Sequence, residues 1–352
     1  MENSGEAGNR QWFRGTMAML DEYGELNLLN AKWRMLLALL VLGPGLAPAL
    51  AGDTPLSVMS FNAWGGGRNT GQSTKQTLAA IEAAGADIIG LQESRGETDP
   101  CGANYCPPHG PSITRELAEA LQFHFYEQQA DDQALWSNAI LSRYPILGPT
   151  ELGLGVRIDF QGRLLVLFNI HPTDYPYQPY QLLGIPYGAA PFLQDSAAAV
   201  RYARRTRGPV LQKLLKDLAT AADADLVAIC GDFNEPSHLD WTPAAVEAGL
   251  QPLAVSWPFS QALEANGFVD TYRAVWPEVA VRPGFTWSPL ITPATRDDHA
   301  DRIDFVLVRG KGVRVSDAAI IGEDSEHADV VVSPWPSDHR AVVARLLIPD
   351  PH

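Results

Sequence analysis

The stretch Ile229-Cys230-Gly231-Asp232-Phe233-Asn234-Glu235 is the most informative part of this chain for its fold. Apolar residues 226–229 form a strand-like run, Gly231 provides a turn, and an acid and an amide follow where the strand meets solvent. A second stretch, Ser337-Asp338-His339, places an acid and an imidazole just before another apolar run, residues 341–347. The two stretches together predict a sheet whose strand ends carry the chemistry.

Three more polar residues follow apolar runs in the same way, namely Asn62, Glu93 and His171. Because a sheet brings distant strand ends to one edge, we expect these positions to share one cleft. Each residue alone has a plainer explanation, since asparagines form turns, carboxylates cap helices or stay solvated, and histidines are often bonded structural groups. Their joint occurrence favours a catalytic site.

The composition restricts the class of substrate. The chain has 352 residues, 46% of them hydrophobic, which suits one large domain or two ordinary ones. Its formal net charge is −15, and it is −14 without residues 1–51, which hold five acidic and four basic side chains. Proteins that grip nucleic-acid backbones usually carry the opposite charge, and no basic stripe is evident. Nucleic acid is therefore disfavoured as a partner, whereas a small phosphate-ester substrate is compatible with this charge.

Residues 1–51 are predicted to be an N-terminal extension with a signal peptide, and residues 52–352 the functional domain. Lys32 and Arg34 precede apolar residues 35–42, a Gly/Pro break follows, and Ala49-Leu50-Ala51 offers small residues for cleavage. The apolar run is short for a membrane span, with an uncleaved anchor as the alternative. We therefore expect a secreted or periplasmic monomer with no stable membrane span after cleavage.

Export also makes the cysteines informative. Cys101 and Cys106 lie in a loop-like stretch and could close a small disulfide ring in an oxidising compartment. Cys230 lies within an apolar run and is predicted to be a buried small hydrophobe.

Short apolar runs bounded by Gly, Pro, Asn or Asp predict the strands. These runs are residues 56–61, 87–91, 123–127, 139–141, 164–169, 226–229, 303–308, 313–321 and 341–347. Helical patterns lie between some of them, at residues 74–84, 114–121 and 195–220. This order predicts an α/β fold, a four-layered sandwich of two packed, mainly antiparallel sheets flanked by helices.

Two long segments, residues 172–191 and 283–300, are predicted to be loops that wall a substrate pocket. The first is rich in proline and tyrosine and contains Asp174, for which a phosphate-pocket role, a second-metal role and a turn role stay open. The second contains Trp287, whose ring could stack on a base, cover a lipid headgroup or pack on a sugar. Asp301, just beyond it, is expected to be a solvated charge.

Seven short motifs occur in one order over about residues 56–347. They are Ser60-Phe61-Asn62, Leu91-Gln92-Glu93, Asn138-Ala139-Ile140-Leu141-Ser142, Asn169-Ile170-His171, Gly231-Asp232-Phe233-Asn234, Arg302-Ile303-Asp304-Phe305 and Ser337-Asp338-His339. In this order they resemble the endonuclease/exonuclease/phosphatase superfamily, which includes pancreatic-type deoxyribonuclease, inositol polyphosphate phosphatases and neutral sphingomyelinases. The resemblance implies the same sandwich fold and hydrolysis of phosphate esters.

Such hydrolysis requires charge neutralisation at the phosphoryl oxygens and an aligned water. Glu93 is an oxygen ligand suited to Mg²⁺, with Mn²⁺ or Ca²⁺ as alternatives, and Asn62 would support the metal or hold a phosphoryl oxygen. Asp338 resembles the family's second carboxylate on the metal side. By resemblance, Asp232 orients the attacking water and Asn234 holds a phosphate oxygen; we also assign the deprotonation of that water to Asp232.

Two histidines complete the set. His339 matches the family's catalytic histidine, and Asp304 matches the carboxylate that orients its ring and favours the imidazolium form. His171 would be the second imidazole, which binds the phosphate or protonates the leaving oxygen.

The sequence thus predicts an exported, metal-dependent phosphodiesterase that hydrolyses a small or lipid-derived phosphodiester by direct attack of water. A secreted nuclease acting on DNA or RNA is the alternative. A catalytically silent binding module on the same fold is another, although such a protein would be expected to lack Glu93, Asp232 or His339. A cell-surface protein whose aromatic loops bind a partner is a third alternative, favoured if the N-terminus stays uncleaved.

Overall fold

The computed structural model describes residues 53–95, 112–128, 137–291 and 298–350. The predicted signal peptide and the Cys101–Cys106 pair lie outside these residues, so both stay predictions. In the described part of the chain, no helix is both long and apolar enough to cross a membrane.

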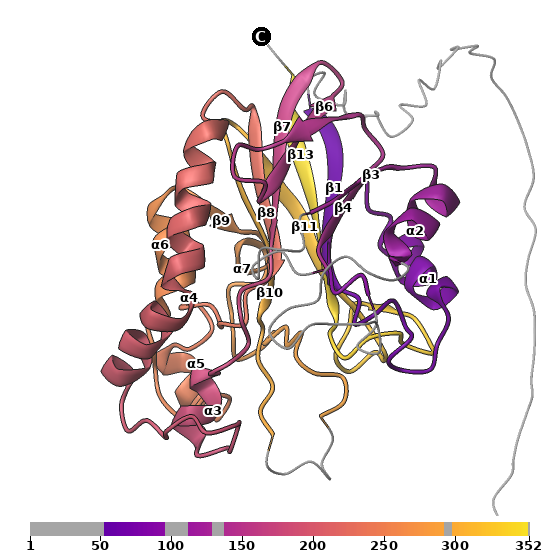
Figure 1. The fold of residues 1–352 in the computed structure, drawn as a ribbon. Helices are drawn as coiled ribbons and strands as arrows, with labels where there is room; N and C mark the ends of the chain where they lie inside the picture. The colour runs from indigo at the N-terminus through magenta and orange to yellow at the C-terminus, as the bar shows by residue number, and fades with distance from the viewer. Residues whose placement is uncertain (1–52, 96–111, 129–136, 292–297, 351–352) are drawn as a thin grey trace, which may run out of the picture. The chain divides into compact units, whose positions relative to one another are not determined.

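Two mixed sheets form the centre of the fold (Figure 1). The seven-stranded sheet has the order β12-β11-β13-β1-β2-β4-β3. Its strands are β1 (Asp53–Asn62), β2 (Ile88–Gln92), β3 (His124–Glu127), β4 (Ala139–Ser142), β11 (Arg314–Gly322), β12 (Val330–Val331) and β13 (Ala341–Pro349). The six-stranded sheet has the order β5-β6-β7-β8-β10-β9. Its strands are β5 (Ile146–Pro149), β6 (Gly155–Phe160), β7 (Arg163–Ile170), β8 (Leu226–Asp232), β9 (Val269–Asp270) and β10 (Asp304–Gly310).

Most neighbouring strands run antiparallel. The parallel pairs are β1 with β2, β7 with β8, and β11 with β12. The prediction of two mainly antiparallel sheets is confirmed.

Helices cover the outer face of each sheet (Figure 1). On the seven-stranded sheet, α1 (Thr74–Ala84) and α2 (Ile113–Leu121) bury Ile81 and Leu117 against β1, β2 and β4. On the six-stranded sheet, α4 (Ser196–Leu218) and α6 (Pro258–Ala265) bury Leu214 and Leu263 against β7, β8 and β10. The shorter helices are α3 (Gln178–Leu183), α5 (Pro243–Glu247), α7 (Thr271–Val275) and the 3-10 turn η2 (Ala219–Ala221).

The alternation of side chains along each strand produces these layers. Val58 of β1 points into the core between the sheets, whereas the next residue, Met59, points into the core beneath α1 and α2. Both faces of the central strands are therefore apolar, which explains why the sequence shows them as continuous apolar runs. The four-layered α/β sandwich is confirmed.

The two sheets approach each other closely below the predicted site. A Cβ atom built on Gly90 of β2 would lie 2.5 Å from the Cβ of Cys230 on β8, so this contact requires glycine. The Gly231 amide donates a hydrogen bond across the sandwich to Ser60 Oγ at 2.9 Å. Cys230 is fully buried, as predicted, and burial raises the pKa of its thiol to about 12. This close contact holds the ends of β1, β2 and β8 together.

The sequence patterns missed several elements. The hairpin of β5 and β6 was not predicted because β5 is short and half-buried, with a glycine in its centre. The segment 172–191 is not wholly a loop, because α3 forms within it. Pro179 lies in the first turn of α3, where proline is tolerated, and Gly184 ends the helix with a φ of 73°.

Candidate active site

The predicted catalytic residues lie at one edge of the sandwich. Asn62 ends β1, Glu93 follows β2, His171 follows β7, and Asp232 ends β8. Asp304 begins β10 and pairs directly with Asp232 in the antiparallel ladder, while Asp338 and His339 precede β13. Because β10 and β13 run antiparallel to β8 and β1, their starts meet the ends of the other strands at this edge.

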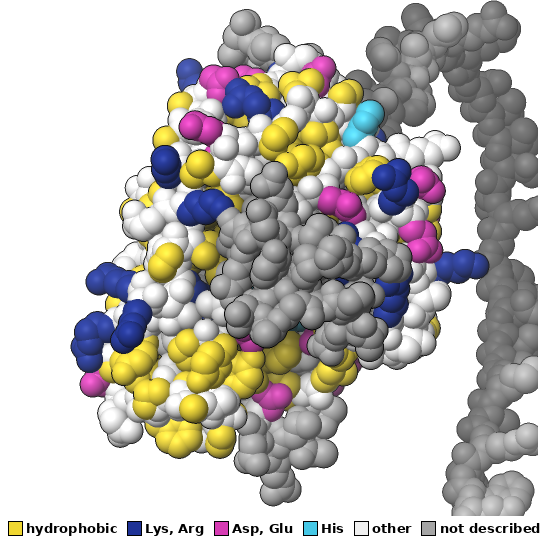
Figure 2. Space-filling model, viewed as in Figure 1, with side chains coloured by type: hydrophobic (Ala, Val, Ile, Leu, Met, Phe, Trp, Pro, Cys, Tyr) yellow, Lys and Arg dark blue, Asp and Glu magenta, His cyan; other side chains and the backbone are white. Residues whose placement is uncertain are grey.

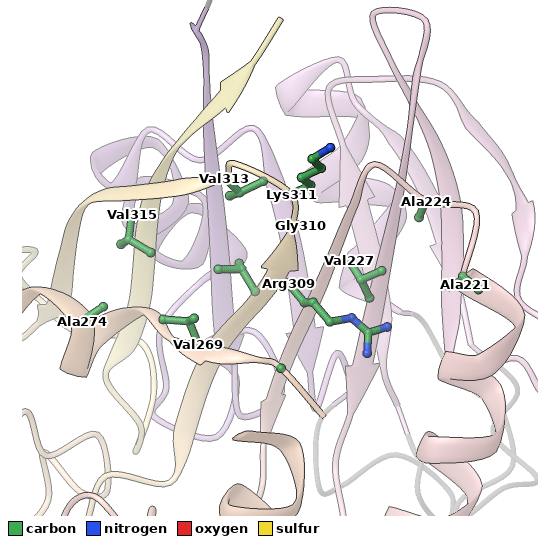
Figure 3. A pocket seen from close by; sticks show the side chains of 13 residues that line it. Ala221, Ala224, Val227, Val269, Ala274, Arg309, Gly310, Lys311, Val313 and Val315 are labelled. Carbon is green, nitrogen blue, oxygen red and sulfur yellow. The ribbon is translucent and has the colours of Figure 1, made fainter. Parts of the chain in front are cut away.

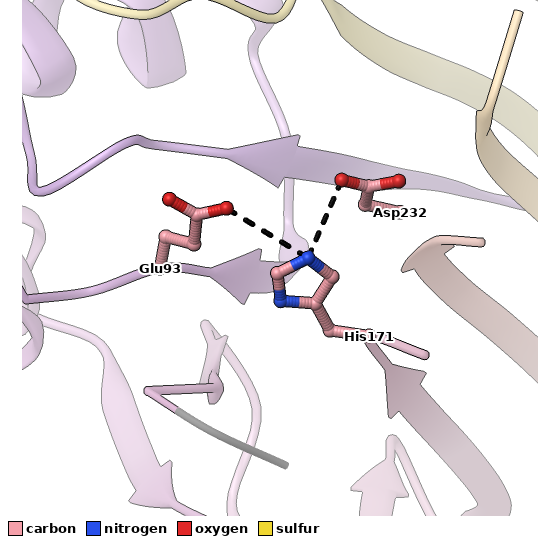
Figure 4. Close-up of side chains that lie close together, drawn as sticks. All are labelled: Glu93, His171 and Asp232. Carbon is pink, nitrogen blue, oxygen red and sulfur yellow. Dashed lines mark ion pairs between the residues drawn. The ribbon is translucent and has the colours of Figure 1, made fainter. Parts of the chain in front are cut away.

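An acid–imidazole cluster joins the two sheets (Figure 4). His171 Nε2 lies 3.4 Å from Asp232 Oδ2 and 3.7 Å from Glu93 Oε1. Asn62 Nδ2 donates to Glu93 Oε1 at 2.8 Å and to Asp232 Oδ2 at 3.1 Å. Residues from four strands, two in each sheet, are thus in direct contact.

His339 and Asp304 form the second part of the cluster. His339 Nδ1 lies 2.9 Å from Asp304 Oδ2, and both residues are buried. The opposite nitrogen, Nε2, lies 3.6 Å from Asp232 Oδ2. The pair fits the predicted arrangement, in which a carboxylate orients the imidazole and leaves Nε2 facing the other site groups.

The local charges favour protonated histidines and an ionised Asp232. Burial alone would lower the pKa of His339, but Asp304 and Asp232 outweigh it and raise the pKa well above its usual value. The pKa of His171 is also raised, because Asp232 and Glu93 outweigh burial. Burial would raise the pKa of Asp232, yet the two histidines lower it to about 2. The Asp232 carboxylate thus lies between two imidazoles whose protonated forms it favours.

Asp338 supplies an observation that bears on a metal ion. Its Oδ1 atom is buried and has no hydrogen-bond partner among the described residues. Burial, together with the nearby charges of Glu93 and Asp232, raises its pKa to about 7 despite His339. A divalent cation beside these oxygen atoms would relieve the repulsion and satisfy Oδ1, and hard cations such as Mg²⁺ prefer such ligands. The group Glu93, His171 and Asp232 has ligand atoms within 4.8 Å of one another and could also hold an ion. The residues present fit a metal site.

The turn after β8 places Asn234 beside the start of the tyrosine-rich segment. Asn234 has a φ of 49°, and its amide N–H donates to Asp232 Oδ1 at 3.0 Å. Its side-chain Nδ2 donates to the Pro172 carbonyl at 3.0 Å. Asn234 is thus close to Asp232, as predicted, and also positions the chain that follows His171.

Trp287 adjoins this cluster, whereas Asp174 does not join it. The ring of Trp287 lies 4.9 Å from the ring of His339, centroid to centroid, and its Nε1 donates to the Tyr180 hydroxyl at 3.3 Å. Asp174 is exposed, and its carboxylate accepts a hydrogen bond from the Tyr187 hydroxyl. Its predicted role in substrate binding stays a prediction.

Asp301 is not a solvated charge, which corrects the expectation from the sequence. It is fully buried and accepts hydrogen bonds from Tyr177 Oη at 2.7 Å, Trp241 Nε1 at 2.8 Å and Gln251 Nε2 at 3.2 Å. Its backbone also bonds with that of Trp287 in both directions. Asp301 thereby connects the tyrosine-rich segment to the wall beside His339. No local pattern in the sequence could indicate this role, because its partners come from four separate segments.

A separate cavity of about 680 Å³ lies at the opposite ends of β8 and β10 (Figure 3). Val227, Val308 and Val313 line it, with Arg309 and Lys311. Val227 precedes Asp232 by five residues along β8, which corresponds to roughly 17 Å. The described residues that line the cavity include no carboxylate. The cavity is therefore not part of the catalytic cluster.

Carboxylates, amides and two imidazoles at the shared edge of two packed sheets are the groups that hydrolysis of a phosphate ester requires. The chain belongs to the endonuclease/exonuclease/phosphatase family, whose model matches residues 59–339.

The individual proteins that resemble this chain have low sequence identity to it. An uncharacterised protein of Caenorhabditis elegans is 27% identical over 323 residues, which cover 88% of this chain and 97% of that protein. Among solved structures, an AP endonuclease from Archaeoglobus fulgidus has 15% identity and a TM-score of 0.48, with 82% of this chain and 98% of that chain covered. TDP2 of D. rerio, complexed with a single-stranded DNA product, has 18% identity and a TM-score of 0.44, with 84% and 99% covered.

Proposed function

We propose that this protein is an exported, metal-dependent phosphodiesterase that hydrolyses a small or lipid-derived phosphodiester by direct attack of water. The observation that carries the proposal is the cluster of Asn62, Glu93, His171 and Asp232, with the His339–Asp304 pair against the same Asp232 oxygen. The family match supports the reaction class.

Each of these side chains has its own role in the hydrolysis. Asp232 is ionised at neutral pH, since its pKa is about 2, and orients the attacking water by accepting a hydrogen bond from it. We also assign to Asp232 the acceptance of that water's proton. His339, whose pKa Asp304 helps to raise, stabilises negative charge on the phosphoryl oxygens, and Asn234 donates a hydrogen bond to them. Asn62, whose side-chain amide already donates to Glu93 and Asp232, supports the residues on the metal side. His171, whose pKa Asp232 and Glu93 raise against the effect of burial, donates a proton to the leaving oxygen.

Glu93 and Asp338 would hold a divalent metal ion, which we propose to be Mg²⁺. Such an ion would neutralise charge on the phosphoryl group as the bond to the leaving oxygen breaks. The raised pKa of Asp338 and its unpaired Oδ1 support an ion at this position.

The substrate proposal rests on the surroundings of the cluster. The wall beside His339 consists of Trp287 and tyrosines whose hydroxyls already donate to acids, as Tyr177 does to Asp301 and Tyr180 to Asp298. Such a wall presents aromatic rings backed by acids, which suits one phosphate with an organic substituent better than a polyanion. Export is proposed from residues 1–51 and would be tested by N-terminal sequencing of the mature protein.

The test is hydrolysis of bis-p-nitrophenyl phosphate, the matching monoester and plasmid DNA, each with Mg²⁺, Mn²⁺, Ca²⁺ or EDTA. The wild-type chain is compared with His339→Ala and with His327→Ala, a matched control at an exposed histidine. We expect metal-dependent release from the diester that is lost only in His339→Ala, without DNA cleavage.

Other results would point elsewhere. DNA cleavage that requires His339 would favour the secreted nuclease. Inactivity on every substrate, together with no heat of Mg²⁺ binding by calorimetry, would favour a binding module.

A further inference from the structure

One segment next to the site has an unusual composition. Residues 175–194 contain no charged side chain, although 19% of the chain is charged. The segment begins four residues after His171 and runs through α3 to the residue before the N-cap of α4. A surface segment of this length without charge requires a physical explanation.

The segment exposes large apolar side chains. Phe192 is 52% exposed, and Tyr175, Tyr187 and Leu183 are each more than a third exposed. These four belong to the nine large hydrophobic side chains that are exposed in the described residues. Scattered exposed hydrophobics are ordinary, but a contiguous group of this kind marks an interaction surface.

Internal contacts hold the segment in place. The rings of Tyr175 and Tyr187 meet edge to face at 5.4 Å, and Gln181 Nε2 donates to the Pro191 carbonyl at 2.6 Å. Beneath the segment, the buried Arg207 donates to the Asp174 carbonyl at 3.1 Å. The apolar side chains are therefore presented on a supported surface.

Basic side chains follow this segment in the chain, on the first half of α4. Arg201, Arg204 and Arg205 are exposed on the first half of α4, at a spacing that places them on one face of the helix. Figure 2 shows hydrophobic side chains gathered at the lower left, where Figure 1 draws α3, with Lys and Arg side chains along the adjoining edge.

We infer that residues 175–194 and the three arginines form a docking face for a lipid bilayer with anionic headgroups. Aromatic and aliphatic side chains favour the boundary between headgroups and acyl chains, and neighbouring arginines are attracted to anionic lipids. The acidic remainder of the chain acts weakly beyond a Debye length of about 8 Å. A nucleic acid would match the arginines but leave the apolar side chains uncovered.

The position of the docking face connects it with the active site. Its first residues continue the chain from His171, and Asn234 holds the Pro172 carbonyl next to Asp232. A protein docked in this way would bring its catalytic edge to the membrane surface, where lipid phosphodiesters are found.

The experiment is flotation of the full-length chain with vesicles of phosphatidylcholine alone or with one third phosphatidylglycerol. The apolar variant is Leu183→Ser with Phe192→Ser, and the charge variant is Arg201→Gln, Arg204→Gln and Arg205→Gln. The matched controls are Val281→Ser and Lys311→Gln. Both side chains lie outside the docking face and are exposed, Val281 by 75%. All chains share the same N-terminus, so differences in vesicle binding among them arise from the substituted positions.

We expect the wild-type chain and both controls to bind the anionic vesicles. The apolar variant should bind the anionic vesicles about tenfold more weakly than wild type. The charge variant should bind them more weakly by about tenfold or more. High salt should weaken vesicle binding by the wild-type chain until it approaches the binding of the charge variant. Equal binding by all chains would overturn the inference, as would no vesicle binding by wild type, the result expected if a protein partner covers this face.

Hydrolysis of soluble bis-p-nitrophenyl phosphate is measured in parallel. Unchanged rates in the docking variants would show that the fold and site are intact, so a loss of vesicle binding would belong to the docking face. Absence of hydrolysis in every chain would instead contradict the proposed function. The vesicle result would still decide whether the docking face binds lipid.

Discussion

Glu235, three residues after Asp232, is expected to make the stability of this protein depend on pH. The side chain is 1% exposed; Oε1 accepts a hydrogen bond from the Phe259 amide at 2.8 Å, and Oε2 has no hydrogen-bond partner among the described residues. Burial raises the pKa of Glu235 from 4.5 to about 7, against the opposing influence of Arg207. The perturbation is Glu235→Gln, which keeps the acceptor and removes the titration.

The direction in which the free energy of unfolding changes with pH follows from the protons bound by the folded and unfolded states. Between pH 4.5 and 7, the folded state keeps the proton on Glu235 while the unfolded chain has lost it. The free energy of unfolding of the wild-type protein therefore falls as the pH rises through this window and levels off above it. At 1.36 kcal/mol per pKa unit, the loss amounts to about 3 kcal/mol. The variant lacks this loss.

The assay is thermal unfolding of wild type and Glu235→Gln at pH 4.5, 6, 7 and 8. The difference in Tm, variant minus wild type, should become more positive by roughly 5–10 °C between the lowest and the highest pH. Glu247→Gln, at an exposed glutamate on α5, should show no such trend. A difference between variant and wild type that stays constant across this range would refute the reasoning, whatever its size.

Three further predictions concern the site and the packing beneath it. Asp304→Asn removes a charge that raises the pKa of His339, so the alkaline limb of the pH–rate profile should move to lower pH and kcat should fall about 10²–10⁴-fold; an unchanged limb would contradict the pairing. Mg²⁺ at 100 times its Kd should stabilise wild type by about 2.7 kcal/mol in thermal unfolding, and Asp338→Asn should reduce this gain; an equal gain in both would exclude Asp338 as a ligand. Gly90→Ala should cost about 1–3 kcal/mol in urea unfolding, because its Cβ would meet the opposite sheet at 2.5 Å, whereas Gly208→Ala in α4, with open space around it, should cost nothing.

The strands and the positions of the candidate site residues could be predicted from the sequence for related physical reasons. Central strands such as β8 are buried on both faces, so they appear as unbroken apolar runs, and chemistry needs polar groups where such runs end. Asn62, Glu93 and Asp232 were recognisable because each interrupts the hydrophobic pattern at a strand end. Short or edge elements such as β5 and α3 are less visible, since packing against neighbours determines them more than local pattern does.

The sequence by itself determined the sandwich, the family and the set of acids, amides and histidines that meet at one edge. Only the tertiary structure decided which of these groups touch, and it placed Asp301 in the interior and gave Glu235 its pKa of about 7. It also left large apolar side chains of the uncharged segment 175–194 exposed. The reason is physical: hydrophobic periodicity is a local property of the chain, whereas burial, charge pairing and surface patches depend on residues that are distant in sequence and adjacent only after folding.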